Sequence, residues 1–316
     1  MDTRVHVCCM MQNALNWRSR YRNYEMFHDF ITHSKGFPQL YTAEIAFGDT
    51  PHVITRADEP WHNLQLRTDC ELWNKEGAID LLIQRLPADA EYIAWFDADV
   101  TLTDNCWAKH VVDLLQHYDV VQLFSHTQDL GTSFQPVGPI LKSYYYRYVE
   151  ECGRDMYKLN KNKEMITGLA WAARKSVLSK VGMLPDWCVM SSCDRHIAAG
   201  FIGNIEDSFG HGKMGLNKNF VDKTVSWGQR AYNVVRGNVS YLPGLLLHYW
   251  HGERRNRGYV DRWKLMRDYD FNPDTDIVRD YQGLYRWAGN KPALRDAFRE
   301  LLHHRNEDEQ GEKLLP

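Results

Sequence analysis

The stretch EYIAWFDADVTLT, residues 91–103, places two aspartates directly after an apolar run. Residues 93–96 predict a buried strand, and Asp97 and Asp99 follow where that strand ends. Side chains two residues apart on an extended chain share a face, so the two carboxylates repel each other. A hard divalent cation such as Mn²⁺ or Mg²⁺ would relieve that repulsion, because it takes oxygen ligands. A solvated turn at the strand end is the alternative.

Strand-like runs alternate with helical patterns from the N-terminus to Ser125. Such alternation predicts an α/β fold, a mostly parallel sheet with helices on both faces. Ligands of such sheets bind at the carboxyl ends of the strands, where the two aspartates stand. The expected strands are residues 4–11, 40–49, 91–100 and 119–127, and the expected helices are residues 16–33, 74–87 and 105–118.

The second half is less regular. The run VSYLPGLLLHYWHG, residues 239–252, predicts a late strand that ends in histidines, and SSCDRHIAAGFIG, residues 191–203, predicts a small-residue helix behind a polar cap. We expect one domain over residues 1–259 and a helical extension over residues 260–316 packed on it. The polar end of that extension, from His303 onward, is expected to be frayed.

Composition excludes several classes of protein. A net charge of −3 argues against a general electrostatic grip on nucleic acid, though not against a local basic patch. Seven cysteines without framework spacing, with Cys8 and Cys9 adjacent, favour a reducing compartment. No apolar run reaches the length of a membrane span, and the N-terminal apolar stretch is too short for a signal peptide. We expect a cytoplasmic protein that does not bind membranes and leave its oligomeric state open.

Two histidines and a run of arginines follow the late strand. His248 and His251 are three residues apart, and imidazoles combined with a carboxylate suit Mn²⁺. One structural and one solvent-facing histidine is the alternative. Clustered guanidiniums usually bind phosphate oxygens, although a solvated helix face would explain them too. The arginines are Arg254, Arg255, Arg257 and Arg262.

Three further groups of residues suit an anionic ligand and a proton transfer. Asn74 and Lys75 open a predicted helix, where backbone N–H groups favour anions. Asp194 is the most plausible lone carboxylate for a general base, or else a helix N-cap. A second basic cluster follows the first strand and consists of Arg18, Arg20 and Arg22.

In this order, the motifs resemble those of the GT-A glycosyltransferases, and within them the β-1,4-galactosyltransferase-like family. The resemblance covers residues 5–263 and rests on several motifs of low individual specificity. These are Trp17-Arg18-Ser19-Arg20, WNKEGAIDLL (73–82), FDADV (96–100), TGLAWAARKSVLSKVGMLPDW (167–187), SSCDRH (191–196) and HYWHGERRNRGYVDRW (248–263). Two features depart from the family: Asp194 alone stands for a glycine-rich acidic run, and His248 stands where the family has a thioether.

The resemblance implies a GT-A (Rossmann-like) fold and a metal-dependent, inverting hexosyl- or pentosyltransferase. Its donor would be a nucleotide-diphosphate sugar, with a UDP-sugar favoured. Asp99 and His251 would bind Mn²⁺ or Mg²⁺ with His248 as a further ligand, and Asp97 would act through water or hold the donor ribose.

The remaining roles follow from the same resemblance. Arg18, Arg20, Asn74 and Lys75 would hold the nucleotide, and Arg255 or Arg257 the phosphates. Asp194 would take the proton from the acceptor hydroxyl. Gly168 would let the backbone approach the sugar, and Trp171 would offer a stacking face.

Two other functions fit parts of the sequence. FDADVTLT, residues 96–103, also matches the Asp-x-Asp-x-Thr motif of haloacid-dehalogenase-like phosphohydrolases, with Asp97 as nucleophile. A non-enzymatic binding module on a transferase fold is the other. For a transferase, the acceptor would be a glycan precursor or a hydroxylated base in phage DNA.

Overall fold

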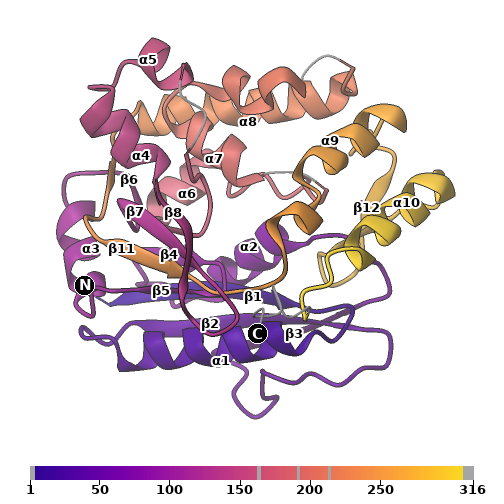
Figure 1. Cartoon of the computed structure of the whole chain (residues 1–316), viewed down its shortest axis with the longest axis horizontal. Coiled ribbons are helices and arrows are strands. Elements are labelled where there is room, and N and C mark those ends of the chain that lie inside the picture. The colour runs from indigo at the N-terminus through magenta and orange to yellow at the C-terminus, as the bar shows by residue number, and fades with distance from the viewer. Residues whose placement is uncertain (1–3, 162–164, 191–192, 213–214, 309–316) are drawn as a thin grey trace, which may run out of the picture.

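A seven-stranded sheet forms the centre of the molecule (Figure 1). The structure is a computed structural model that describes residues 4–161, 165–190, 193–212 and 215–308. β9 runs antiparallel to its neighbours β4 and β6, and every other neighbouring pair is parallel. The strand order is β10 (Val239–Tyr241), β6 (Val120–Gln122), β9 (Ala170–Arg174), β4 (Tyr92–Phe96), β1 (Val5–Gln12), β2 (Gln39–Phe47) and β3 (Asn63–Thr68).

Two smaller sheets complete the strand inventory of the described residues. The four-stranded sheet has the order β5 (Val100–Leu102), β11 (Leu245–His248), β7 (His126–Leu130) and β8 (Pro136–Lys142). A hairpin of β12 (Ile277–Arg279) and β13 (Tyr285–Trp287) forms the third.

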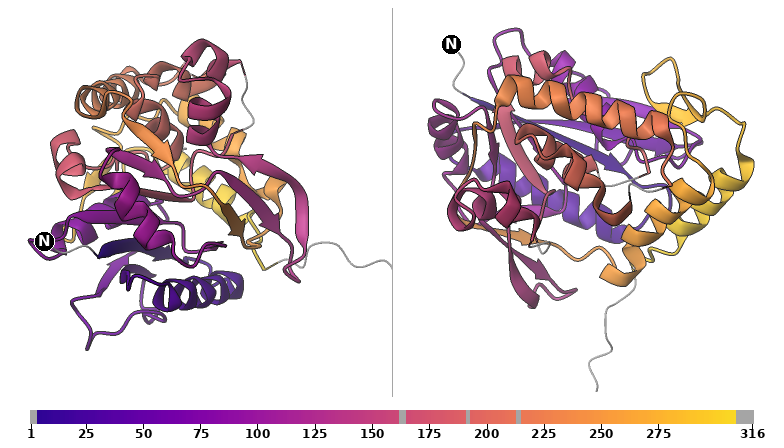
Figure 2. Two further views of the ribbon diagram at one scale, coloured as in Figure 1. Left: turned by 90° about the vertical axis from the view of Figure 1, so that its left-hand side faces the viewer. Right: turned by 90° about the horizontal axis from the view of Figure 1, so that it is seen from above.

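Helices cover both faces of the central sheet (Figure 2). α1 and α3 pack on one face, and α2, α6, α7 and α8 on the other. The helices are α1 (Arg18–His33), α2 (Lys75–Arg85), α3 (Trp107–Leu115), α4 (Tyr144–Tyr146), the π-helix η1 (Arg147–Glu151), α5 (Met156–Asn160), α6 (Lys175–Val181), α7 (Cys193–Phe201), the 3₁₀ helix η2 (Ile205–Gly212), α8 (Lys218–Val235), the 3₁₀ helix η3 (Arg254–Arg257), α9 (Tyr259–Asp268) and α10 (Pro292–His303). The predicted mixed α/β architecture is confirmed.

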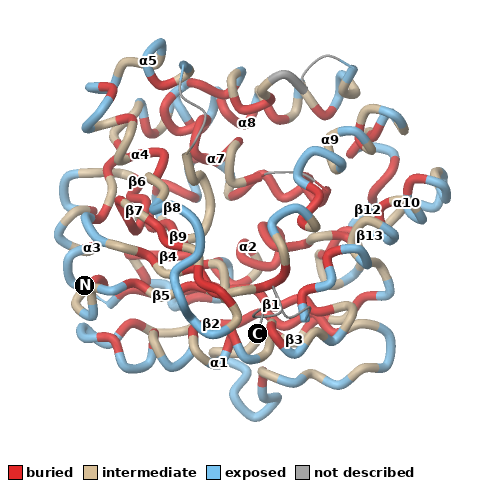
Figure 3. Tube along the Cα trace, viewed as in Figure 1, coloured by how far each residue is buried: buried red, intermediate tan, exposed pale blue. Residues whose placement is uncertain are grey.

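The apolar run before the two aspartates divides between two cores. Trp95 faces the core beneath α2 and α8, whereas Phe96 faces the core beneath α1 and α3, as the two-residue period of a strand requires. Both side chains are fully buried, and burying a side chain such as Phe96 stabilises the fold by roughly 1.5–3 kcal/mol. Figure 3 shows these central strands as the buried interior of the chain.

Two predicted strands each break into two. Residues 119–127 supply β6 and β7, and residues 239–252 supply β10 and β11, so each run leaves the central sheet and enters the four-stranded one. The two breaks lie side by side, because the Ser125 backbone N–H donates to the Gly244 carbonyl over 3.1 Å. Pro243 lacks an N–H for the ladder, which explains the second break. The short strand β3 was not predicted.

The C-terminal residues form part of the same body. The expected helical extension contains the β12–β13 hairpin as well as α9 and α10, and Phe271 and Phe298 join the core beneath α2. The prediction of a frayed end from His303 is wrong up to Asp308, because Arg305 and Glu307 are buried. Residues 309–316 lie outside the described residues. No helix in the described part of the chain is both long and apolar enough to cross a membrane.

Candidate active site

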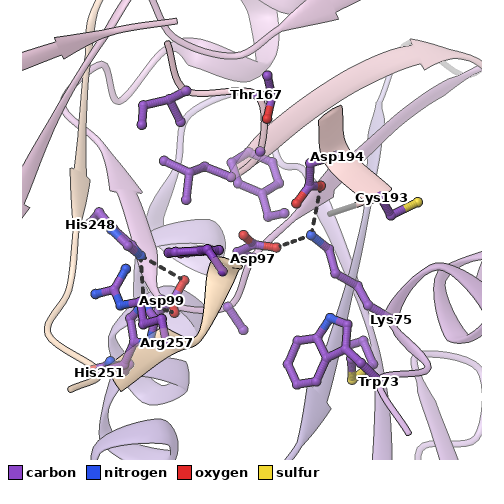
Figure 4. A pocket seen from close by; sticks show the side chains of 18 of the residues that line it. Trp73, Lys75, Asp97, Asp99, Thr167, Cys193, Asp194, His248, His251 and Arg257 are labelled. Atoms are coloured by element: carbon purple, nitrogen blue, oxygen red, sulfur yellow. Dashed lines mark hydrogen bonds and ion pairs between the residues drawn. The ribbon is translucent and has the colours of Figure 1, made fainter. Parts of the chain in front are cut away.

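A pocket of about 570 Å³ opens at the carboxyl ends of β1 and β4, as expected for this class of sheet. Asp97 and Asp99 line it between β4 and β5, and Lys75 and Asp194 line it from the first turns of α2 and α7. His248, His251 and several arginines complete the wall (Figure 4). The volume is within the range of small-molecule sites.

Three of the predicted metal ligands come together. Nε2 of His251 lies 3.6 Å from Asp99 Oδ2, and Nε2 of His248 lies 3.9 Å from Asp99 Oδ1. The two Nε2 atoms are 3.1 Å apart, and one ligand atom from each of the three residues falls within a 4.8 Å group. The pairing of β5 with β11 creates this arrangement, because it sets His248 opposite Val100.

The three side chains suit a divalent cation. Asp99 Oδ1 is buried and accepts no hydrogen bond from the described residues, so its negative charge lacks a donor. Burial, followed by the positive charge of Arg257, lowers the pKa of His251 well below its ordinary value, so its imidazole is neutral. One carboxylate and two imidazoles form a ligand set that suits Mn²⁺. The residues present therefore fit the implied metal.

Asp129 holds one of these histidines from behind. Its Oδ1 lies 2.7 Å from Nδ1 of His248, because β7 and β11 are parallel and in a register that pairs these residues. Burial opposes ionisation of Asp129, but the hydrogen bond from His248 holds its pKa below its ordinary value. A carboxylate on the outer nitrogen of a metal-binding histidine fixes the ring and its tautomer. The sequence did not mark Asp129, since its partner lies 119 residues away.

Lys75 binds two of the predicted carboxylates. Its Nζ lies 2.5 Å from Asp97 Oδ1 and 3.1 Å from Asp194 Oδ1 (Figure 4). Burial acts to lower the pKa of Lys75, but Asp194 and Asp97 outweigh it and raise that pKa well above its ordinary value. The ammonium thus bridges the strand that carries Asp97 and the helix that carries Asp194. Its charge is already compensated without a nucleotide.

Gly168 makes room for Asp194 in this arrangement. A Cβ at this position would lie 2.9 Å from Asp194 Oδ2 and 3.1 Å from its Cγ. The approach of the Gly168 backbone to a sugar stays a prediction, and in this structure the close neighbour of Gly168 is the Asp194 carboxylate.

Glu76 is a third carboxyl group in this cluster that the sequence did not mark. It is buried and lines the pocket next to Lys75. Burial raises its pKa to about 8, and Asp194 adds to that effect against the charge of Lys75. Glu76 is therefore largely protonated at neutral pH and adds little negative charge beside Lys75.

A second group of charges consists of buried and half-buried arginines. Glu307 is paired with Arg20 at 2.6 Å and with Arg305 at 2.8 Å, which is why the C-terminal segment folds into the pocket wall. Burial opposes ionisation of Glu307, but the two arginines hold its pKa below its ordinary value. Arg257 and Arg262 lie nearby, and the Nε atoms of both are buried without a partner among the described residues. Burial lowers the pKa of Arg305 to about 10. These buried positive charges suit an anionic ligand.

The other predicted site residues lie outside the pocket. Arg18 and Arg255 are exposed and do not line it. Asn74 is buried, and its side chain exchanges hydrogen bonds with the backbone of Tyr285 at 2.8 and 3.1 Å. Trp171 is buried in the sheet with its ring stacked on Trp95, so it offers no face to a ligand in this structure.

Comparisons with known proteins give only distant matches. No protein-family model matches the sequence, and no curated protein matches it. S. aureus TarS is 10% identical with a TM-score of 0.39, over 74% of this chain and 73% of that one. GalNAc-T7 with UDP, GalNAc and Mn²⁺ is 12% identical with a TM-score of 0.40, over 95% of this chain and 54% of that one. Mycobacterium tuberculosis glucosyl-3-phosphoglycerate synthase, solved with Mn²⁺, UDP and phosphoglyceric acid, is 10% identical with a TM-score of 0.41, over 84% and 75%. Likeness at this level says nothing about the activity of this chain.

Proposed function

We propose that this chain is a metal-dependent GT-A glycosyltransferase that moves a sugar from a nucleotide-diphosphate sugar to an acceptor hydroxyl. The observation that carries the proposal is one pocket in which Asp99, His248 and His251 converge beside Arg257 and Arg262, whose Nε atoms are buried. A cation site next to arginine Nε–H groups that have no partner among the described residues suits a diphosphate better than a single phosphate. A UDP-sugar is the favoured donor.

Asp99, His248 and His251 would hold Mn²⁺ or Mg²⁺. When bound, the cation supplies positive charge that stabilises the leaving nucleoside diphosphate. Arg257 and Arg262 bind the phosphate oxygens through their free Nε–H groups. Neither arginine has to leave a carboxylate to do so, whereas Arg20 is already held by Glu307.

Asp194 is the proposed general base. The acceptor hydroxyl gives its proton to the Asp194 carboxylate, its oxygen bonds to the anomeric carbon, and the bond from that carbon to the diphosphate oxygen breaks, with inversion. Burial raises the pKa of Asp194, which makes it a better base, and Lys75 holds its Oδ1 in place. The transferred sugar is a hexose or a pentose, and the acceptor is a glycan precursor or a hydroxylated nucleobase such as one in phage DNA.

A nucleotide-sugar screen tests this proposal. Thermal shifts would be recorded for a panel of nucleotide sugars with and without Mn²⁺, followed by assays of donor hydrolysis. We expect a metal-dependent shift with a UDP-sugar, and slow release of UDP that Asp194→Asn lowers by about 10²- to 10⁴-fold. Aryl phosphate turnover that depends on Asp97, without any nucleotide-sugar binding, would instead establish the phosphohydrolase.

A control separates loss of chemistry from loss of the fold. Asp119→Asn changes another aspartate that pairs with a cation, Arg174, at 2.6 Å, and neither of these two residues lines the pocket. We expect this variant to keep both the thermal shift and the hydrolysis rate. If Asp194→Asn and Asp99→Ala both left hydrolysis unchanged, the non-enzymatic binding module would be the better account.

A further inference from the structure

Four exposed arginines lie beside the pocket. Arg18 and Arg22 lie on the first turns of α1, and Arg254 and Arg255 lie on η3. No ion pair involves any of these four guanidiniums within the described residues, although carboxylates outnumber lysines and arginines in the whole chain. Arg254 also lines the pocket. The positive charge here is therefore a local feature of the surface.

An exposed phenylalanine accompanies these arginines. Phe134 lies at the tip of the β7–β8 hairpin with 45% of its surface exposed and a φ of +62°. A bulky residue rarely adopts this left-handed conformation, and such strain concentrates at functional sites. The guanidinium of Arg22 lies 5.5 Å from the ring centroid, and the ring of Tyr249 supports it edge-on at 6.2 Å.

These residues continue the wall of the pocket. β7 and β8 contribute Asp129 and Leu141 to the pocket lining, and the same hairpin carries Phe134 outward to Arg22 on α1. Most of β8 is exposed (Figure 3). The arginine rim, as we call it, consists of Arg18, Arg22, Phe134, Arg254 and Arg255.

We infer that the arginine rim binds a nucleic-acid strand, which makes the acceptor a nucleic acid that bears a hydroxyl group. The inference rests on the proposed transferase function. Arg257 and Arg262 already face a diphosphate donor inside the pocket, so the outer arginines are available to bind further anionic groups. Phosphodiesters spaced along a strand provide these groups, and an aromatic ring among arginines offers a stacking face for a base. A neutral glycan would leave the four guanidiniums without a ligand.

Fluorescence anisotropy with a short labelled single-stranded oligonucleotide tests the inference. Wild-type protein should bind it with an affinity that falls as salt rises. The double variant Arg22→Ala/Arg255→Ala should reduce the slope of log Kd against log salt by roughly 0.7 for each phosphate that is no longer neutralised by an arginine. Phe134→Ala should weaken binding about tenfold, as expected when one base loses its stacking partner.

A matched control removes two positive charges elsewhere. Lys109→Ala/Lys180→Ala alters exposed lysines on α3 and α6, two helices that contribute nothing to the pocket. This variant should bind the oligonucleotide as the wild type does. Equal weakening by the control variant would show that attraction is non-specific and would overturn the inference. The inference would also be overturned if the protein bound inorganic polyphosphate or anionic vesicles more tightly than the oligonucleotide and Phe134→Ala left that binding unchanged.

Binding of UDP with Mn²⁺, measured on the same preparations, separates this inference from the proposed function. If the protein binds UDP but shows no salt-dependent binding of the oligonucleotide, the nucleic-acid inference is refuted and the proposed transferase function stands. If the protein binds the oligonucleotide through Phe134 and Arg22 but binds no nucleotide sugar, the proposed transferase function is refuted and the arginine rim remains a nucleic-acid-binding surface.

Discussion

Asp129 accepts a hydrogen bond from Nδ1 of His248 at 2.7 Å, and this contact turns Nε2 of the same ring toward Asp99. An ionised carboxylate has no hydrogen to donate, so Nδ1 carries the proton of this hydrogen bond and Nε2 is the nitrogen left to face a cation. Asp129 therefore prepares His248 to bind a cation before any cation arrives.

Loss of Asp129 should weaken metal binding. We expect Asp129→Ala to lower the affinity for Mn²⁺ by about 10- to 100-fold, measured by calorimetric titration of the metal alone. Asp129→Asn should lose less, because an amide oxygen can still accept from Nδ1. Asp104→Ala is the matched control, since Asp104 binds Nδ1 of His110 at the same 2.7 Å outside the pocket. An unchanged Mn²⁺ affinity in Asp129→Ala would refute this role.

The two aspartates of the opening strand end should differ in effect. Asp99→Ala should abolish Mn²⁺-dependent UDP binding, because it removes the only carboxylate of the three converging side chains. Asp97→Ala should weaken that binding less, because the Asp97 carboxylate forms an ion pair with Lys75 at 2.5 Å. Calorimetry of UDP at saturating and zero Mn²⁺ measures both effects. Equal losses of metal dependence would place Asp97 in direct contact with the cation and contradict the asymmetry.

Sequence reasoning located the centre of the site because its elements are local or meet by a general rule. A buried strand that ends in two carboxylates was visible in the sequence, and parallel strands bring their carboxyl ends to one edge. His248 and His251 reached Asp99 because a second apolar run ends beside the first. The arginines of η3 were visible as a cluster, but their spacing did not show that Arg257 would be buried and Arg255 exposed.

The remaining errors concern contacts between distant segments. The polar end of the chain was expected to be frayed, yet Glu307 is fully buried because Arg20, 287 residues away, provides its counter-charge. Trp171 appeared suited to stack on a sugar, but β9 inserts antiparallel between β4 and β6 and carries the ring into the core. Neither the pairing of a charge nor the place of a strand in a sheet follows from local periodicity.

Gly252 should prove essential for seating the C-terminal segment. A Cβ there would lie 2.9 Å from the Arg305 carbonyl oxygen and 3.1 Å from the Glu307 Cα, and both are backbone atoms that cannot move aside alone. Gly289 has nearly the same φ, +91° against +90°, and nothing within 4 Å. Gly289→Ala should therefore cost only the backbone strain, about 1–2 kcal/mol, and Gly252→Ala more.

Thermal denaturation and UDP titration together check this comparison. Gly252→Ala should also weaken UDP binding, because the displaced segment carries Arg305 and Glu307, which form part of the pocket wall. Equal stability losses in the two glycine variants would mean that the C-terminal segment does not pack against Gly252.

His196 should make the fold sensitive to acid. Burial lowers its pKa to about 3, with the charge of Arg195 as a smaller cause, and its Nδ1 lies 2.7 Å from Ser208 Oγ. The ordinary pKa of an unfolded histidine is near 6.5. Between these values the unfolded chain binds a proton at this position and the folded chain does not. The stability from neutral His196 is therefore complete above about pH 6.5 and falls toward pH 3 by about 1.4 kcal/mol per pH unit.

His196→Gln removes the titrating group and keeps a polar side chain beside Ser208. The free energy of unfolding of both proteins would be measured by urea denaturation from pH 7.5 to the lowest pH at which both remain folded. Other groups titrate equally in both, including His251, so the difference between the two curves isolates His196. We expect the variant to be less stable at pH 7.5 and the gap to narrow as the pH falls below about 6.5. Parallel curves over that range would show that His196 takes up a proton in the folded chain, which would contradict its burial against η2, α8 and α9.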